Sequence, residues 1–184
     1  MSYISDFNRL LNSDRVIIEV GSNEQSKSYK IPKGILCTIP WFDRALQDGG
    51  FREGTEGKIT LPEDDPASFE MFQYLLFNGR LHFESISAGD DPKTDLESEL
   101  GTCVKAWIFG DKYSISDLQN CVMARMCDIF LTKEILLPVQ CVITCYGSTV
   151  PGSPLRVLAA ECVMQQIIKE ECTIGAYEGA VAHG

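Results

Sequence analysis

Eight cysteines are the first residues of this 184-residue chain that could carry chemistry, as nucleophiles, disulfide partners or metal ligands. A buried free Cys packs like a small hydrophobic residue. Their number is about half of the ~8–10% density that is typical of disulfide scaffolds. We therefore expect free thiols that serve core packing. Most lie beside apolar residues in stretches with helical periodicity, and these are Cys103, Cys121, Cys127, Cys141, Cys145, Cys162 and Cys172.

Two clusters have residue types that metal ions bind, but neither has the pattern of a metal site. Cys141 and Cys145 lie four residues apart on one face of a predicted helix, and no second pair of ligands lies nearby in sequence. The densest carboxylate cluster, at residues 63–65, precedes Pro66. Acidic side chains at such a helix start cap free N–H groups and complement the helix dipole. We predict no metal ligands.

Catalytic and cofactor motifs are missing from the sequence. Its two histidines are His82 and His183, which argues against a catalytic triad that depends on His. The sequence contains neither a GxGxxG motif after a strand nor a P-loop. The remaining enzymatic alternative is a small hydrolase or redox protein that uses a cysteine, although a reactive thiol needs an electropositive, exposed setting. We predict a binding module with no catalytic residue and no cofactor.

The charge of the chain bears on the class of partner. It has 16 Lys and Arg against 26 Asp and Glu, a net charge of −10. Such a surface repels nucleic-acid phosphates and anionic lipids. No apolar run approaches the ~18–20 residues of a membrane span, and the first residues lack the pattern of a secretory signal. We expect protein partners, no nucleic acid, no membrane, and a cytoplasmic or nuclear location.

Strand patterns come early in the chain and helix patterns come late. The spacing of Ile4, Phe7, Leu10 and Leu11 predicts an amphipathic helix, and residues 15–21 and 26–31 read as a β-hairpin. Two short helices at 33–37 and 41–47 and a strand at 58–61 follow. A helix capped by Asp65 and begun by Pro66 ends at Gly79.

The second half of the chain starts with residues 84–99, which hold six acids and one base and predict a solvated, mobile loop. From Leu100 onward the periodicity is helical throughout. One predicted helix runs from about residue 133 to 146, and the last has Ser153 as its cap and an apolar stripe that includes Leu155 and Ile167. This order of elements indicates an α+β fold.

Several stretches together resemble a BTB/POZ domain, in the form found in the fungal branch of that family. The resemblance covers residues 4 to about 131 as the domain and 133–172 as a helical extension, so we divide the chain into 1–131 and 132–184, the latter with a frayed end. The stretches are 14–21 (DRVIIEVG), 29–37 (YKIPKGILC), 41–46 (WFDRAL), 51–53 (FRE), 59–66 (ITLPEDDP), 105–113 (KAWIFGDKY) and 152–156 (GSPLR).

The resemblance implies a small sheet flanked by a cluster of helices, and protein–protein association as the task of the domain. In BTB domains the first helix commonly forms a two-fold dimer contact. That role would fall here to Ile4, Phe7, Leu10 and Leu11. Only three residues precede Ile4, so we expect any homodimer to form without the strand exchange of many family members.

Two further roles follow from the same resemblance. BTB adaptors of cullin-based ubiquitin ligases carry a hydrophobic–any–Glu motif, which Phe51-Arg52-Glu53 matches, with Phe51 and Glu53 as the cullin contacts. Asp14 and Lys33 match the charged positions of a pocket that transcriptional members use for partners, although Pro32 stands where many members have His. An association scaffold and a cullin adaptor are therefore the two functions that we carry forward.

Overall fold

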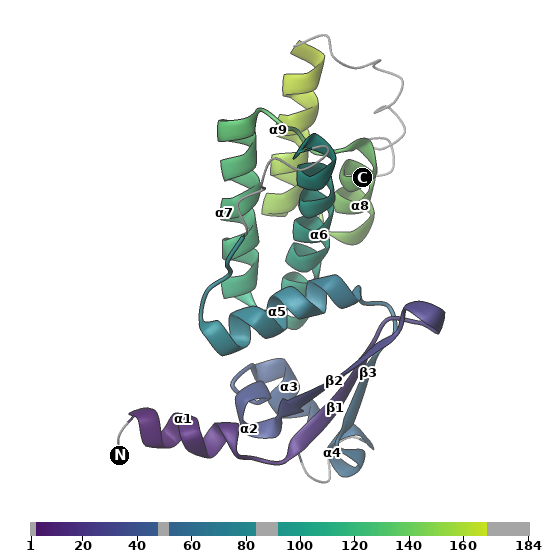
Figure 1. Cartoon of the computed structure of the whole chain (residues 1–184). Coiled ribbons are helices and arrows are strands. Elements are labelled where there is room, and N and C mark those ends of the chain that lie inside the picture. Colours follow the sequence, from purple (N-terminus) through teal and green to yellow (C-terminus); the bar gives the residue numbers. More distant parts are fainter. Residues whose placement is uncertain (1–2, 48–51, 84–91, 169–184) are drawn as a thin grey trace. The chain divides into compact units, whose positions relative to one another are not determined.

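The computed structural model describes residues 3–47, 52–83 and 92–168, and it shows an α+β fold (Figure 1). Its contacts divide the chain into two compact units. Unit 1 comprises residues 1–80 and 113–115, and unit 2 comprises residues 81–112 and 116–184. This division of contacts differs from the family-based boundary at residue 131, which stays a prediction. Each unit is described by itself.

A three-stranded mixed sheet forms the centre of unit 1. Strands β1 (Arg15–Val20) and β2 (Lys27–Pro32) form the expected antiparallel hairpin across a short 3-10 turn, η1 (Asn23–Gln25). Strand β3 (Lys58–Leu61) pairs in parallel with the other side of β1, which gives the order β2-β1-β3. Val16, Ile18 and Val20 of β1 point into the core, in the alternation that a sheet with one buried face requires.

Five helices of unit 1 surround this sheet within the described residues. They are α1 (Tyr3–Leu11), α2 (Lys33–Leu36), α3 (Pro40–Ala45), α4 (Arg52–Glu56) and α5 (Pro66–Asn78). The signals for α5 are confirmed: Asp65 accepts hydrogen bonds from the N–H groups of Ala67 and Ser68 at 3.0 and 3.2 Å, and Gly79 ends the helix with φ +68°. Helix α4 was not predicted.

An aromatic cluster fills the core of unit 1. Phe42 stacks on Phe72 and on Tyr113, each pair with ring centroids 5.6 Å apart. Trp41 meets the ring of Tyr113 edge-on at 4.6 Å. The Tyr113 hydroxyl group donates to Asp64 Oδ2 at 2.6 Å, which satisfies the polar end of this buried side chain.

Unit 2 is helical throughout its described part. Its elements are α6 (Pro92–Tyr113, of which Tyr113 belongs to unit 1), α7 (Ser116–Lys133), α8 (Val139–Ser148) and α9 (Pro154–Ile168) (Figure 1). Arg125 of α7 binds Glu99 of α6 through two nitrogens at 2.6 and 3.1 Å. Arg156 of α9 donates to the carbonyl oxygens of Tyr146 and Thr149, and so closes the carboxyl end of α8.

The structure corrects two predicted elements. Residues 92–99 are the first turns of α6, not a loop, because Leu96 within the acidic stretch is buried on the same helix face as Leu100, which directly follows it. The remaining loop residues, 84–91, lie outside the described residues. The helix expected at 133–146 begins at Val139, because Pro138 cannot occupy a helix interior and stands at the N-cap instead.

Candidate protein-interaction surfaces

Helix α1 presents apolar side chains to solvent. Ile4 is 69% exposed and Phe7 is 40% exposed, whereas Leu10 and Leu11 are half-buried. The four residues of the predicted contact therefore lie on one helix, with the first two most accessible. Exposed aromatic and branched apolar side chains of this size are a common feature of protein-binding surfaces.

The carboxyl end of α1 is fixed to α2 by a small polar junction. The Ser13 hydroxyl group donates to the carbonyl oxygen of Leu10 and accepts the N–H of Gly34, both at 2.7 Å. Gly34 has no side chain to keep the two helices apart, and a Cβ there would lie 3.0 Å from the Leu10 backbone. This junction holds one end of α1 while its first turn carries the exposed Ile4 and Phe7.

The residues of the predicted charged pocket, Asp14 and Lys33, lie next to each other through their backbones. The N–H of Lys33 donates to the carbonyl oxygen of Asp14 at 2.7 Å, where β1 begins and β2 passes into α2. Asp14 is exposed and Lys33 is half-buried. The two charged residues therefore belong to the same backbone junction, where Asp14 precedes β1 and Lys33 begins α2.

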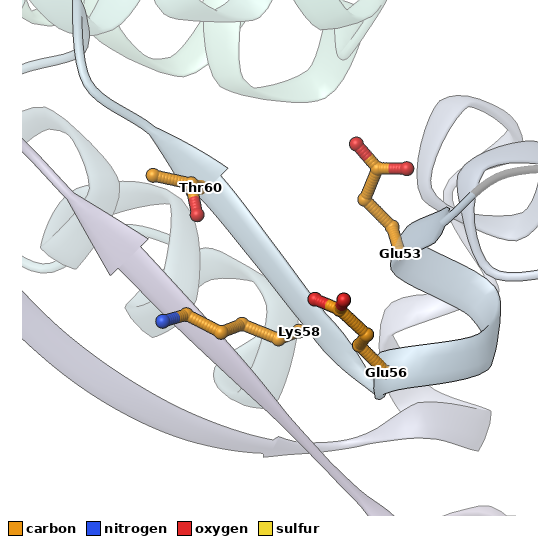
Figure 2. Close-up of a pocket in the computed structure, with 4 residues that line it drawn as sticks. All are labelled: Glu53, Glu56, Lys58 and Thr60. Carbon is orange, nitrogen blue, oxygen red and sulfur yellow. The ribbon is translucent and has the colours of Figure 1, made fainter.

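Glu53 of the predicted cullin motif lies in α4 beside a hollow. Glu53, Glu56, Lys58 and Thr60 line this hollow, and Figure 2 shows the two glutamates on α4 next to the strand that carries the other two residues. Lys58 also forms an ion pair with Glu19 at 2.8 Å. Phe51 lies outside the described residues. Glu53 itself is half-buried.

The position of α4 depends on Gly54, which, like Gly34, lies very close to another backbone segment. A Cβ on Gly54 would lie 2.5 Å from the carbonyl oxygen of Gln47, closer than any real contact. Only glycine therefore fits between α4 and the end of the preceding segment. Gly54 sets the position from which Glu53 reaches the hollow.

The outer face of α9 is a surface that the sequence prediction missed. Val157, Met164 and Ile168 are 61%, 55% and 73% exposed. The predicted buried stripe holds for Leu155, but Ile167 is partly exposed rather than part of the core. The exposed residues recur at i, i+7 and i+11 and could have been read as a second stripe.

The cysteines of the described residues are free thiols, and four of the seven are buried. Burial raises the pKa of the Cys103 and Cys145 thiols to about 12 and that of Cys162 to about 11. The three thiols are therefore protonated near neutral pH. Cys172 lies outside the described residues.

The part of the chain that the structure describes has neither a cluster of metal ligands nor a membrane-spanning helix. No group of three or more His, Cys, Asp or Glu side chains there is arranged to hold a metal ion. None of the helices in those ranges combines the length and apolar character needed to cross a membrane.

Comparisons with models of protein families and with curated proteins give no match to this chain.

Proposed function

We propose that this protein is a non-enzymatic association module of the BTB/POZ type, which forms homo- or hetero-oligomers as a scaffold in the cytoplasm or nucleus. The observation that carries the proposal is helix α1, with its exposed Ile4 and Phe7 and its anchored carboxyl end. A preorganised helix pays less conformational entropy on binding than a flexible segment. Covering its apolar side chains on a second copy would remove them from water.

Two independent features support the BTB/POZ assignment. The sequence stretches that resemble the family include both sides of the junction at Asp14 and Lys33. The order of helix, hairpin, short helices, parallel strand and capped helix in unit 1 agrees with a small sheet flanked by helices. The proposed homodimer uses the exposed face of α1.

Light scattering of the purified chain tests the α1 contact. Full burial of an apolar side chain of the size of Phe contributes roughly 1.5–3 kcal/mol. Phe7 is 40% exposed, so covering it in both copies contributes about 1–2.5 kcal/mol, and Phe7→Asp should weaken association about tenfold. Ser5→Asp adds the same charge to an exposed position of the same helix and is the matched control. A wild-type chain that stays monomeric at high micromolar concentration, or a mass unchanged by Phe7→Asp, contradicts the homodimer.

The second candidate function is that of a substrate adaptor for a cullin-based ubiquitin ligase. The observation that favours it is the position of the half-buried Glu53, which lines the hollow beside α4 and β3. In this proposal Phe51 fills an apolar pocket on the cullin and Glu53 pairs with a cation at its rim.

Calorimetric titration with a cullin N-terminal domain tests the adaptor function. The double variant Phe51→Ala, Glu53→Ala should lose binding at least about a hundredfold, since hot-spot residues each contribute about 2 kcal/mol or more. Glu56→Ala removes a carboxylate from the same helix and hollow and is the control. Absence of binding by the wild-type chain, or equal binding by the double variant, argues against this function.

A further inference from the structure

Strand β3 is an edge strand of the sheet in unit 1. The carbonyl oxygens of Gly57 and Leu61 accept hydrogen bonds from the N–H groups of Ile17 and Gly21, so their polar groups face β1. Because these groups alternate in direction along a strand, the N–H and C=O groups of Lys58 and Thr60 face away from β1. Within the residues that the structure describes, these groups have no hydrogen-bond partner. Such an edge can pair with another strand.

The hollow beside α4 lies along this same edge. It has a volume of about 210 Å³, and Lys58 and Thr60 line it together with Glu53 and Glu56. Figure 2 shows the Lys58 side chain extending over the sheet, away from α4, and its ammonium group pairs with Glu19 at 2.8 Å. The positive charge of Lys58 is therefore balanced by the sheet, and the two glutamates of α4 dominate the charge of the hollow.

The charge and the size of the hollow define the side chain that it can bind. A cation complements two carboxylates, and the planar guanidinium group of arginine can donate hydrogen bonds to both of them at once. A volume of about 210 Å³ is room for roughly seven waters at about 30 Å³ each. An arginine side chain has about the same number of non-hydrogen atoms, so one such side chain would fill the hollow.

We propose that the edge of β3 and the adjoining hollow bind an extended segment of another protein that carries an arginine. The segment pairs through its backbone with Lys58 and Thr60, and its arginine lies between Glu53 and Glu56. Backbone pairing supplies affinity, and the hollow supplies selectivity for the side chain. The inference goes beyond the proposed function, because it gives the scaffold a partner site that is separate from α1.

Fluorescent heptapeptides with blocked ends test the selectivity of the site. Their outer positions are randomised among Thr, Val and Ser, which favour an extended backbone, and the central residue is Arg, its uncharged isostere citrulline, or Glu. The Arg pool should bind at least about tenfold more tightly than the citrulline pool, because hydrogen bonds between two charged groups are the stronger ones. The Glu pool should not bind. Fluorescence anisotropy measures each affinity, and equal binding of the Arg and citrulline pools, or no binding of the Arg pool, overturns the proposal.

Variants of the full chain separate the carboxylates from the strand edge. The double variant Glu53→Gln, Glu56→Gln should remove the preference for Arg over citrulline. Thr60→Pro deletes an outward N–H group at a position where edge strands tolerate proline, and it should prevent the binding of every pool. Thr60→Val keeps that N–H group and is the matched control. The variants are compared only if their circular dichroism and thermal midpoints match those of the wild type, and an unchanged preference for Arg in the double variant overturns the proposal.

Hydrogen exchange reads the strand edge in the wild-type chain, should Thr60→Pro fail to fold. The amide of Thr60 faces away from β1, so saturation with the Arg pool should slow its exchange at least about tenfold. The amide of Ile17 already donates to Gly57 at 3.0 Å and is the internal control, which should change less. Unchanged exchange of the Thr60 amide in the saturated complex would show that the segment does not pair with β3.

The site can be told apart from the two proposed functions. Phe7→Asp should bind the Arg pool as the wild type does, because α1 contributes no residue to the hollow. Glu56→Gln alone should weaken binding of the Arg pool and leave cullin binding unchanged, because the cullin motif contains Glu53 and not Glu56. Loss of Arg-pool binding in Phe7→Asp would place the contact on α1 and overturn the proposal.

Discussion

The buried phenol group of Tyr113 donates a hydrogen bond to the carboxylate of Asp64. Burial, and next its hydrogen bond to Asp64, raise the pKa of Tyr113 above the ordinary value of 10. The folded chain therefore keeps this phenol protonated under conditions in which the unfolded chain ionises it. Its contribution to stability is complete below about pH 10 and is lost as the pH rises further.

Tyr113→Phe should remove both the hydrogen bond and this pH dependence. At pH 7 we expect a loss of about 1–3 kcal/mol in the free energy of unfolding, because the partner is charged. Between pH 9 and 11 the difference between wild type and variant should shrink. Urea unfolding at each pH measures it, and Tyr74→Phe at an exposed position is the control. A difference that stays constant with pH would disprove the assignment.

The buried thiols give a prediction about reactivity. With a pKa of about 11 to 12, Cys103, Cys145 and Cys162 should be labelled at pH 8 at least about a hundredfold more slowly in the native chain than in the unfolded chain, since each unit of pKa lowers the thiolate fraction tenfold. Mass spectrometry after timed alkylation measures each site. Rapid labelling of any of these three would contradict this prediction and favour the cysteine-based enzyme.

At the scale of elements, the junction of α1 and α2 depends on the missing side chain of Gly34. Gly34→Ala would place a Cβ 3.0 Å from the Leu10 backbone and from Ser13 Oγ. We expect a loss of roughly 1–3 kcal/mol, as for other overpacked sites, together with weaker self-association. Gly147→Ala, where a Cβ meets no atom within 4 Å, is the control. Unchanged stability and association would show that α1 is not anchored there.

Elements with local signals were predictable from the sequence. The hairpin and α5 carry alternation, a cap, a first-turn proline and a terminal glycine, so both were placed correctly. Residues 92–99 were not, because their acidic composition outweighed the one buried apolar residue among them, Leu96. Helix α4 has one turn and a packing glycine, and nothing local distinguishes such a glycine from one in a loop.

The candidate surfaces also differ in how far they could be predicted from the sequence. The stripe of α1 could be read from its spacing, because its other positions are polar. The hollow beside Glu53 could not, since it requires β3 to return beside β1 after α4. The outer face of α9 was hidden because apolar residues on opposite sides cancel the periodic signal, so only the packed structure separates the buried stripe from the exposed one.

The whole molecule is acidic, and the acidity is uneven. Unit 2 has 7 Lys and Arg against 14 Asp and Glu, which accounts for most of the net charge of −10. Copies that associate must bring like charges together, whereas the contact proposed for α1 is apolar. Salt screens this repulsion over about 8–10 Å at physiological ionic strength.

We therefore expect self-association to strengthen by about two- to tenfold, a difference of roughly 0.4–1.4 kcal/mol, when NaCl is raised from 50 to 500 mM. Sedimentation at several salt concentrations measures this. Phe7→Asp should show little change, because its association is already lost. Weaker association at high salt would indicate a contact held by ion pairs, contrary to the apolar face proposed for α1.

Unit 1 is not a continuous stretch of chain. The chain leaves it at residue 80 and returns for three residues, 113–115, which supply the phenol ring between Trp41 and Phe42. A fragment that ends at residue 80 would lack this ring and leave the Asp64 carboxylate without its hydroxyl donor. Fragments for expression or for two-hybrid assays must therefore extend past Ile115, and a fusion partner inserted between α6 and α7 would disturb the sheet-containing unit.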